Sequence, residues 1–206
     1  SPKDHARDTV NAGAGVVDAE VAELVTQEAR DYILDLTSMG TPFDRTKDGG
    51  YVLSREAAHG FARVVRVKGD QAGAGIMAAL IEQVRATPSI QVLEGIMAVA
   101  LDVDDGRVTG IEIQDADEGS APVMLRGTGV LLAGGGSGGL YALTTNPPRI
   151  RGQVIGLAAR AGALIADAEF VQFHPTAMDV GEDPAPLATE ALRGEGAILV
   201  NRHSER

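Results

Sequence analysis

The sequence predicts an α/β fold with a small antiparallel insertion. Two segments carry apolar residues at the spacing of amphipathic helices, and several short runs rich in β-branched residues follow them. One run ends in a cluster of glycines, as strands do where the backbone must approach a bulky ligand. Of the 206 residues, 44% are hydrophobic, which is ample for a packed core.

Three helices are expected. The first covers residues 18–39, with Asp18 as N-cap and a glycine just after its end. The second covers residues 76–86 and is followed shortly by a proline. A shorter third helix is expected over residues 155–161, where a glycine again follows.

Five strand-like runs lie between the second and third helices. They cover residues 90–93, 96–103, 108–113, 123–125 and 129–133. Asp105 and Gly106, between two of the runs, form a hairpin signal, because both residue types tolerate the left-handed backbone of a tight turn. The runs from 96 to 125 therefore predict the antiparallel insertion, and the polar stretch 115–121 is its loop tip.

Composition argues against several kinds of partner and site. The 18 basic and 29 acidic residues give a net charge of −11, which argues against nucleic acid or an anionic membrane as partner. Without cysteine the chain can hold no disulfide and no thiolate metal site. No apolar run approaches the roughly 20 residues that span a bilayer. We expect a cytoplasmic protein with neither a membrane segment nor a metal site.

The most informative stretch is residues 169–196, EFVQFHPTAMDVGEDPAPLATEALRGEG. Pro175 pushes His174 toward extended geometry, so the imidazole is held on a stiff, non-helical segment. A hydroxyl, a guanidinium and two carboxylates follow: Thr189, Arg193, Glu190 and Glu195. Gly194 and Gly196 flank the last carboxylate and suggest close backbone approach. A lone histidine is usually structural, and charges alone usually form a surface face; together they indicate an anion-binding site.

These motifs resemble a known superfamily. The run FVQFHPT followed by TEALRGEG is similar to the flavoproteins of succinate dehydrogenase and fumarate reductase, and the chain from SPKDHARDTVNAGAG onward resembles the aspartate oxidases. The resemblance implies FAD as cofactor, a partial Rossmann-like FAD-binding domain over residues 1–170 and the start of a substrate-capping domain over 171–206.

The resemblance also implies an internal fragment. It puts the GxGxxG fingerprint before Ser1 and the principal catalytic arginine after Arg206, so the isolated chain should be inactive and bind FAD poorly. The implied reaction is oxidation of L-aspartate, or another small dicarboxylate, with oxygen or fumarate as acceptor. This is the first step of quinolinate and NAD biosynthesis, and quinolinate synthase is a candidate partner in the pathway. Apolar faces left uncovered predict self-association.

Three residues are expected to contact substrate. The resemblance matches His174 and Thr189 to side chains that hydrogen-bond a substrate carboxylate. Glu56, in the run SREAAH, matches a glutamate that aspartate oxidases carry in a similar Arg-Glu-Gly-Gly-His run. A carboxylate there would attract the ammonium of aspartate and repel a plain dicarboxylate. Without the resemblance, SREAAH indicates a capped, solvated helix start.

Glu190 and Arg193 are expected behind these contacts, as positioners of the substrate site. A structural ion pair is an equally good interpretation of the two.

The glycine cluster 133–139 is expected near the flavin. Ala133, Gly134 and Gly135 stand where the superfamily has Ala-Thr-Gly-Gly, with Gly134 in place of threonine. Their free N–H groups can form a nest for anionic oxygens, although a flexible loop would give the same letters.

Further cofactor contacts come from the resemblance alone. It implies the backbone of Met97 and Ala98, on a strand that would pass the adenine, and the side chain of Gln153. Relatives often carry an acidic residue and a glycine where Gln153 and Val154 stand, so a surface glutamine at a helix start is an equal alternative.

Two other functions are compatible with these residues. One is a segment of a fumarate reductase or succinate dehydrogenase flavoprotein, against which Glu56 argues. The other is a non-catalytic module that binds anions through the glycine-rich loop and a protein partner through its acidic surface.

Overall fold

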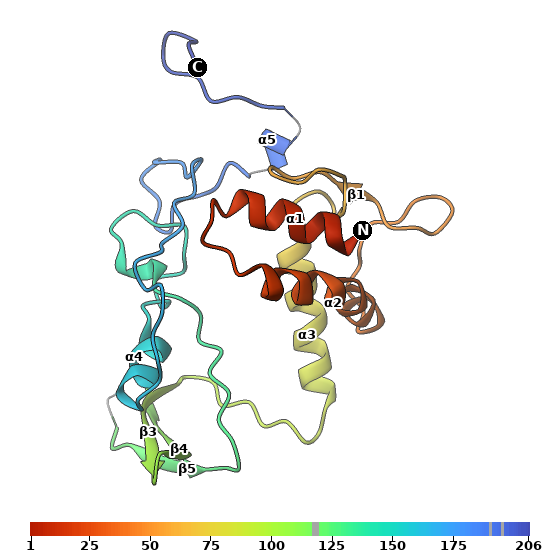
Figure 1. The fold of residues 1–206 in the computed structure, drawn as a ribbon. Helices are drawn as coiled ribbons and strands as arrows, with labels where there is room; N and C mark the ends of the chain where they lie inside the picture. Colours follow the sequence, from red (N-terminus) through yellow and green to blue (C-terminus); the bar gives the residue numbers. More distant parts are fainter. Residues whose placement is uncertain (117–119, 190, 195) are drawn as a thin grey trace. The chain divides into compact units, whose positions relative to one another are not determined.

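The computed structural model describes residues 1–116, 120–189, 191–194 and 196–206. The chain divides into two compact units. The helical unit comprises Ser1–Gln91 and Thr189–Arg206, and the sheet unit comprises Val92–Ala188. Figure 1 shows the elements of each unit along the chain.

The helical unit is built on two helices that pack side by side (Figure 1). Its helices are α1 (Pro2–Ala12), α2 (Ala19–Ser38), α3 (Ala72–Ala86) and the single turn α5 (Ala191–Gly194). Its strands β1 (Leu53–Ser54) and β2 (Val64–Val65) form a short antiparallel pair.

Helix α1 is an element that the apolar pattern did not predict. It begins at a capping box, in which the Ser1 hydroxyl accepts a hydrogen bond from the Asp4 N–H at 3.2 Å. Helix α2 confirms the prediction for residues 18–39, because the Asp18 carboxylate accepts from the N–H groups of Glu20 and Val21 at 2.9 and 3.2 Å.

Helix α3 begins at Ala72 rather than at residue 76. Glycines in its first turns hide the apolar periodicity, yet one of them serves packing. A Cβ on Gly75 would lie 3.3 Å from Val67 Cγ2, so the missing side chain lets α3 pack against that buried valine.

The sheet unit confirms the predicted antiparallel insertion. Strands β3 (Ile96–Asp104), β4 (Arg107–Asp115) and β5 (Val123–Arg126) lie in the order β3-β4-β5. Asp105 and Gly106 close the first hairpin with φ values of +47° and +73°. Helix α4 (Gln153–Arg160) contacts β3, and a short 3-10 helix covers Gly138–Leu140 (Figure 1).

The strands predicted at residues 90–93 and 129–133 are wrong, since neither run is a strand in the described part of the chain. Strands need a hydrogen-bonded neighbour, and no pairing is described for either run. Leu131, in the second run, is 92% exposed.

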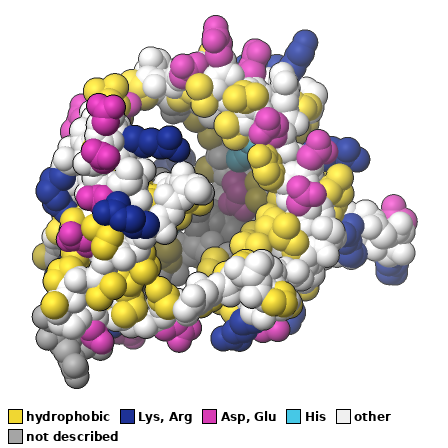
Figure 2. Space-filling model, turned by 90° about the horizontal axis from the view of Figure 1, so that it is seen from below, with side chains coloured by type: hydrophobic (Ala, Val, Ile, Leu, Met, Phe, Trp, Pro, Cys, Tyr) yellow, Lys and Arg dark blue, Asp and Glu magenta, His cyan; other side chains and the backbone are white. Residues whose placement is uncertain are grey.

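The core is thin in both units. Among the described residues the buried hydrophobic side chains are mostly small: Ala6, Ala22, Phe43, Val67, Ala79, Leu157 and Ala185. Many larger hydrophobic side chains are exposed instead, and Figure 2 shows them on the surface beside charged groups. None of the helices in the described residues combines the length and apolar composition of a membrane span.

Candidate functional site

Glu56 lies on the loop of residues 55–63 that joins β1 to β2 in the helical unit. Ser54 and Val64 are partners in the two strands, and the Arg63 N–H donates to the Ser54 carbonyl at 3.1 Å, closing the base of the loop. The helix-start interpretation of SREAAH is therefore wrong. The Ser54 hydroxyl donates to Glu56 Oε1 at 3.3 Å instead of capping a helix.

Hydrogen bonds also run within the loop. The Arg55 Nε donates to the His59 carbonyl at 2.9 Å, and the His59 N–H donates to the Glu56 carbonyl at 3.3 Å. Ala58 adopts a φ of +65°, a left-handed conformation that favours glycine. These bonds fix the backbone around the half-buried Glu56 side chain.

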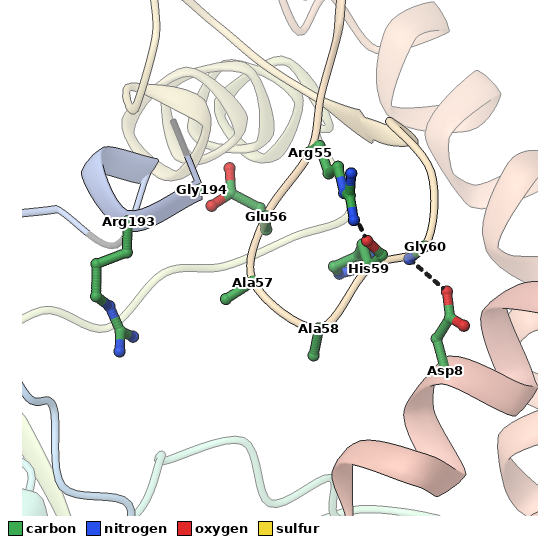
Figure 3. A pocket seen from close by; sticks show the side chains of 9 residues that line it. All are labelled: Asp8, Arg55, Glu56, Ala57, Ala58, His59, Gly60, Arg193 and Gly194. Carbon is green, nitrogen blue, oxygen red and sulfur yellow. Dashed lines mark hydrogen bonds between the residues drawn. The ribbon is translucent and has the colours of Figure 1, made fainter. Parts of the chain in front are cut away.

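Glu56 lines two cavities within the helical unit. The first has a volume of about 420 Å³, and Figure 3 shows its lining, which includes Asp8, Arg55, His59, Arg193 and Gly194. The second has a volume of about 330 Å³ and is lined by Ser54, Arg66, Asp70, Thr189 and Leu192 among others. Three predicted site residues, Glu56, Thr189 and Arg193, are therefore brought together.

Helix α5 sits directly on the Glu56 loop. A Cβ on Gly194 would lie 2.6 Å from the Arg55 carbonyl oxygen, so the close backbone approach predicted at this glycine is confirmed. The Thr189 carbonyl accepts from the Leu192 N–H at 3.1 Å as the turn of α5 begins. The predicted residues Glu190 and Glu195 lie outside the described residues.

Charged side chains on α1 face the same loop. Hydrogen bonds from the Gly60 N–H and the Arg63 guanidinium hold the pKa of Asp8 below its usual range. Burial, with the nearby Arg63 and His59, lowers the pKa of His5, whose ring centroid lies 5.4 Å from that of His59. Sequence reasoning missed these contacts, because nothing in the local pattern pairs a helix with a loop more than fifty residues away.

His174 lies in the sheet unit, half-buried. Its Nδ1 accepts from the Thr176 N–H at 3.3 Å, and the Thr176 hydroxyl donates to the Ala188 carbonyl at 2.6 Å. A bridge between Ala177 and Leu187 fixes the same segment. Because Nδ1 is an acceptor, the neutral ring carries its proton on Nε2, which can donate to an anionic oxygen.

A third cavity, of about 650 Å³, lies in the sheet unit. Its lining includes four of the predicted cofactor residues, Met97, Ala98, Gly134 and Gln153. Ile96, Val154 and Leu157 add apolar surface, and Arg149 and Arg151 add two guanidinium groups. Ala133 and Gly135 are not among the residues that line it.

Gly134 packs against the start of α4. A Cβ at this position would lie 2.4 Å from Val154 Cγ2, so Val154 occupies the space of a side chain at 134. The neighbouring Gly135 adopts a φ of +76°. Glycine at position 134 is therefore matched by valine at position 154.

Gln153 holds the turn that leads into α4. Its Oε1 accepts from the Arg151 N–H at 2.9 Å, and its Nε2 donates to the Arg149 carbonyl at 3.0 Å. Both ends of the amide are thus engaged by the backbone of the turn that carries the two arginines.

Within the described residues no group of three or more His, Asp or Glu side chains could hold a metal ion.

These units define a class of cofactor-binding proteins. The chain belongs to the FAD binding domain family, whose model matches residues 1–206. The superfamily predicted from FVQFHPT and TEALRGEG is confirmed, as is FAD as the cofactor of the family. The helices and antiparallel sheet of the predicted fold class agree with this family.

Several curated relatives are L-aspartate oxidases. The chain is 59% identical over 202 residues to the L-aspartate oxidase of Caulobacter vibrioides and 46% identical over 202 residues to that of Agrobacterium fabrum. It is 38% identical over 212 residues to the L-aspartate oxidase of Streptomyces coelicolor. These matches cover 98%, 98% and 100% of the chain but only 39%, 38% and 36% of the relatives.

Solved structures with the same fold belong to related flavoproteins. The FrdA chain of the quinol fumarate reductase of E. coli matches with a TM-score of 0.90 and 30% identity, over 99% of this chain and 34% of that one. The Sdh1 complex of Mycobacterium smegmatis matches with a TM-score of 0.84 and 32% identity, over 98% of this chain and 36% of that one.

The sheet-unit cavity fits the cofactor of the family. Apolar walls suit a flat ring system, and the guanidinium groups of Arg149 and Arg151 suit an anionic pyrophosphate. Gly134 lines the same cavity, and the space of its missing side chain is filled by Val154.

Proposed function

We propose that this chain works within a flavoenzyme that oxidises L-aspartate to iminoaspartate. The observation that carries the proposal is the position of Glu56: a half-buried carboxylate on a closed loop, lining cavities that it shares with Arg193 and Thr189. Similarity to L-aspartate oxidases over nearly the whole chain supports it.

Glu56 distinguishes aspartate from other dicarboxylates. Aspartate differs from succinate by one α-ammonium group, and a carboxylate in a shielded site attracts that cation. The same carboxylate repels a substrate that carries only negative groups, so it contributes to specificity in both directions.

His174 and Thr189 bind a carboxylate of the substrate. The imidazole donates from Nε2, since its Nδ1 accepts from Thr176, and the threonine donates its hydroxyl. With Glu56 on the ammonium, these contacts orient the Cα–H bond of aspartate toward the cofactor. When bound, FAD would supply a hydride acceptor for the oxidation at Cα. Glu190 and Arg193 position these substrate-binding side chains without contacting the substrate.

The FAD-holding residues lie on β3, the glycine loop and the start of α4. We propose that the backbone of Met97 and Ala98 faces the adenine, and that Ala133, Gly134 and Gly135 approach the flavin. Gln153 keeps the turn that presents Arg149 and Arg151 in place for the pyrophosphate.

The proposed domains differ from the two compact units, which divide the chain after residues 91 and 188. The chain spans about two-fifths of the length of the curated relatives it matches. We propose that residues 1–170 are part of a Rossmann-like FAD-binding domain, and that residues 171–206 begin a substrate-capping domain. Sequence outside the chain then supplies the dinucleotide fingerprint and the principal catalytic arginine, and the isolated chain is inactive.

In the cell we propose the first step of quinolinate and NAD biosynthesis, in the cytoplasm, with oxygen or fumarate as electron acceptor. Iminoaspartate is unstable in water, so an enzyme that consumes it directly, quinolinate synthase, is the partner that this chemistry favours.

A fumarate reductase or succinate dehydrogenase flavoprotein is the second candidate. The solved structures of similar fold, at 30% and 32% identity, support a dicarboxylate site. The carboxylate at position 56 favours aspartate over this alternative, because it would weaken binding of succinate.

The experiment is an assay of the purified full-length protein. We expect the flavin absorbance of bound FAD, and oxidation of L-aspartate when oxygen or fumarate is supplied. Oxidation of succinate in place of aspartate would favour the second candidate. A colourless protein that gains no flavin absorbance when FAD is added would contradict both and favour a non-catalytic module.

A further inference from the structure

We propose that Asp8 is a positioning residue: its carboxylate fastens the loop of residues 55–63 to helix α1 and thereby fixes the place of Glu56. The inference rests on the proposed function, because it assigns Asp8 a role through Glu56. Its geometric part, the fastening of the loop, can be tested separately.

Asp8 contacts Gly60 and Arg63, which lie in the second half of the loop. Its Oδ2 accepts a hydrogen bond from the Gly60 N–H at 2.7 Å and a second, very short one from the Arg63 Nη2 (Figure 3 shows the first). The side chains of Arg63 and Asp8 are only 17% and 13% exposed. A shielded pair of this kind, with a backbone donor on the same oxygen, holds more firmly than an exposed ion pair.

Gly60 makes this contact possible. A Cβ on Gly60 would lie 3.1 Å from Asp8 Oδ2, inside ordinary packing distance, so a side chain would crowd the carboxylate. The bare backbone lets the carboxylate reach the N–H group directly. The sequence therefore provides the glycine, the arginine and the aspartate that the contact requires.

The base and the first half of the loop are held by other elements. The pairing of β1 with β2 fixes its base, and Gly194 of α5 packs against the backbone of Arg55. The hydrogen bonds of Arg55 and His59 described above run within the loop, so they move with it. Asp8 thus ties the second half of the loop to α1 by hydrogen bonds, beside the ring contact between His5 and His59.

Helix α1 is a firm support for this contact. Its N-terminus is fixed by the Ser1–Asp4 capping box, and it packs along α2. Asp8 also lines the first Glu56 cavity, but its Oδ2 is engaged by Gly60 and Arg63, and its Oδ1 forms an ion pair with Arg7 at 3.8 Å. The carboxylate therefore acts on substrate through the loop rather than by contact.

The test uses the full-length FAD-loaded enzyme with Asp8→Ala and Asp8→Asn. Hydrogen exchange of the peptide that spans residues 55–63 reports the fastening, and KM and kcat for aspartate report its consequence. Losing a hydrogen bond to a charged group predicts exchange and KM about 10-fold to 100-fold above wild type for Asp8→Ala, with a smaller change in kcat. Asp8→Asn should lie between, since the amide oxygen still accepts from Gly60.

Asp4→Asn is the matched control. It removes the same charge from the same helix one turn earlier, where the partners are Ser1 and Arg7 rather than the loop. Because Asp4 belongs to the capping box of α1, we expect exchange in the 55–63 peptide to rise far less for this variant than for Asp8→Asn. Gly60→Ala perturbs the contact from the loop side and keeps the test informative if Asp8→Ala fails to fold.

Wild-type exchange of the loop peptide in both Asp8→Asn and Gly60→Ala would overturn the inference. Equal effects of Asp4→Asn and Asp8→Asn would also overturn it, because they would reflect only the stability of α1. If loop exchange rises while Glu56→Gln leaves substrate preference unchanged, the fastening stands and the proposed role of Glu56 fails.

Discussion

Ala58 occupies a backbone conformation that suits glycine. Its φ of +65° lies in the left-handed region, which favours glycine. For an alanine this region costs about 1–2 kcal/mol relative to ordinary helical geometry. The loop that carries Glu56 therefore holds some strain of its own, and its hydrogen bonds to α1 and within itself must offset it.

Ala58→Gly should stabilise the protein. Relief of the left-handed strain outweighs the extra freedom of glycine in the unfolded chain, so we expect a gain of up to about 1 kcal/mol, or a few degrees in Tm. Thermal unfolding of the full-length protein measures it. Ala57→Gly is the control, because Ala57 has no positive φ and its replacement should destabilise. A loss of stability from Ala58→Gly would contradict the claim that the backbone of Ala58 is strained.

The identities of the site residues were easier to predict than their local structure and their contacts. The types and spacing of Thr189 and Arg193 pointed to one site, the resemblance added Glu56 to it, and the fold brings the three together. The local state of Glu56 was open to a helical interpretation, since SREAAH carries a good cap. Asp8 could not be found, because its partners lie 52 and 55 residues along the chain.

The junction of the glycine loop and α4 depends on two residues that fit each other. Gly134 leaves the space that Val154 fills. The space between these two positions holds one side chain, which can come from either position. A side chain at both positions would be overpacked.

Gly134→Thr should therefore weaken FAD binding, and Val154→Gly should restore it in the double variant. An added side chain at 2.4 Å from a neighbour costs about 1–3 kcal/mol of packing, or roughly 10-fold to 100-fold in Kd. Titration of the full-length apoprotein with FAD, followed by flavin fluorescence, measures the Kd. Additive effects of the two substitutions on the Kd would contradict the claim that side chains at 134 and 154 compete for the same space.

Elements with strong local signals were predicted well. Helix α2 has its aspartate cap, and the β3–β4 hairpin has its Asp-Gly turn. Helix α1 was missed because it contains few apolar residues, although Ser1 and Asp4 form a good capping box. The run at 129–133 has strand composition but no strand partner in the described residues, and composition cannot supply one.

At the scale of the whole chain, the exposed surface is unusually large. The chain exposes 14953 Å², whereas compact folding at this mass leaves about 9,100 Å², or about 11,000 Å² for two separate domains of half the mass. The excess is therefore present however the two units are arranged. Side chains such as Leu131 and Leu164, at 92% and 93% exposure, contribute to it.

Self-association of the isolated chain is the expected result. Apolar surface in excess of a compact fold is covered by other copies when no other partner is available. Sedimentation velocity across a range of concentrations should show species larger than 21.3 kDa that grow with concentration. A concentration-independent monomer with a cooperative unfolding transition would contradict this prediction.

The substrate preference of Glu56→Gln in the full-length enzyme tests the central claim most directly. Loss of the charge that faces the substrate ammonium should lower kcat/KM for aspartate by about 100-fold and change fumarate reduction by less than about threefold. Glu82→Gln, whose side chain is 73% exposed, should change neither. Equal losses on both substrates, or none on aspartate, would contradict the role of Glu56 as the partner of the ammonium group.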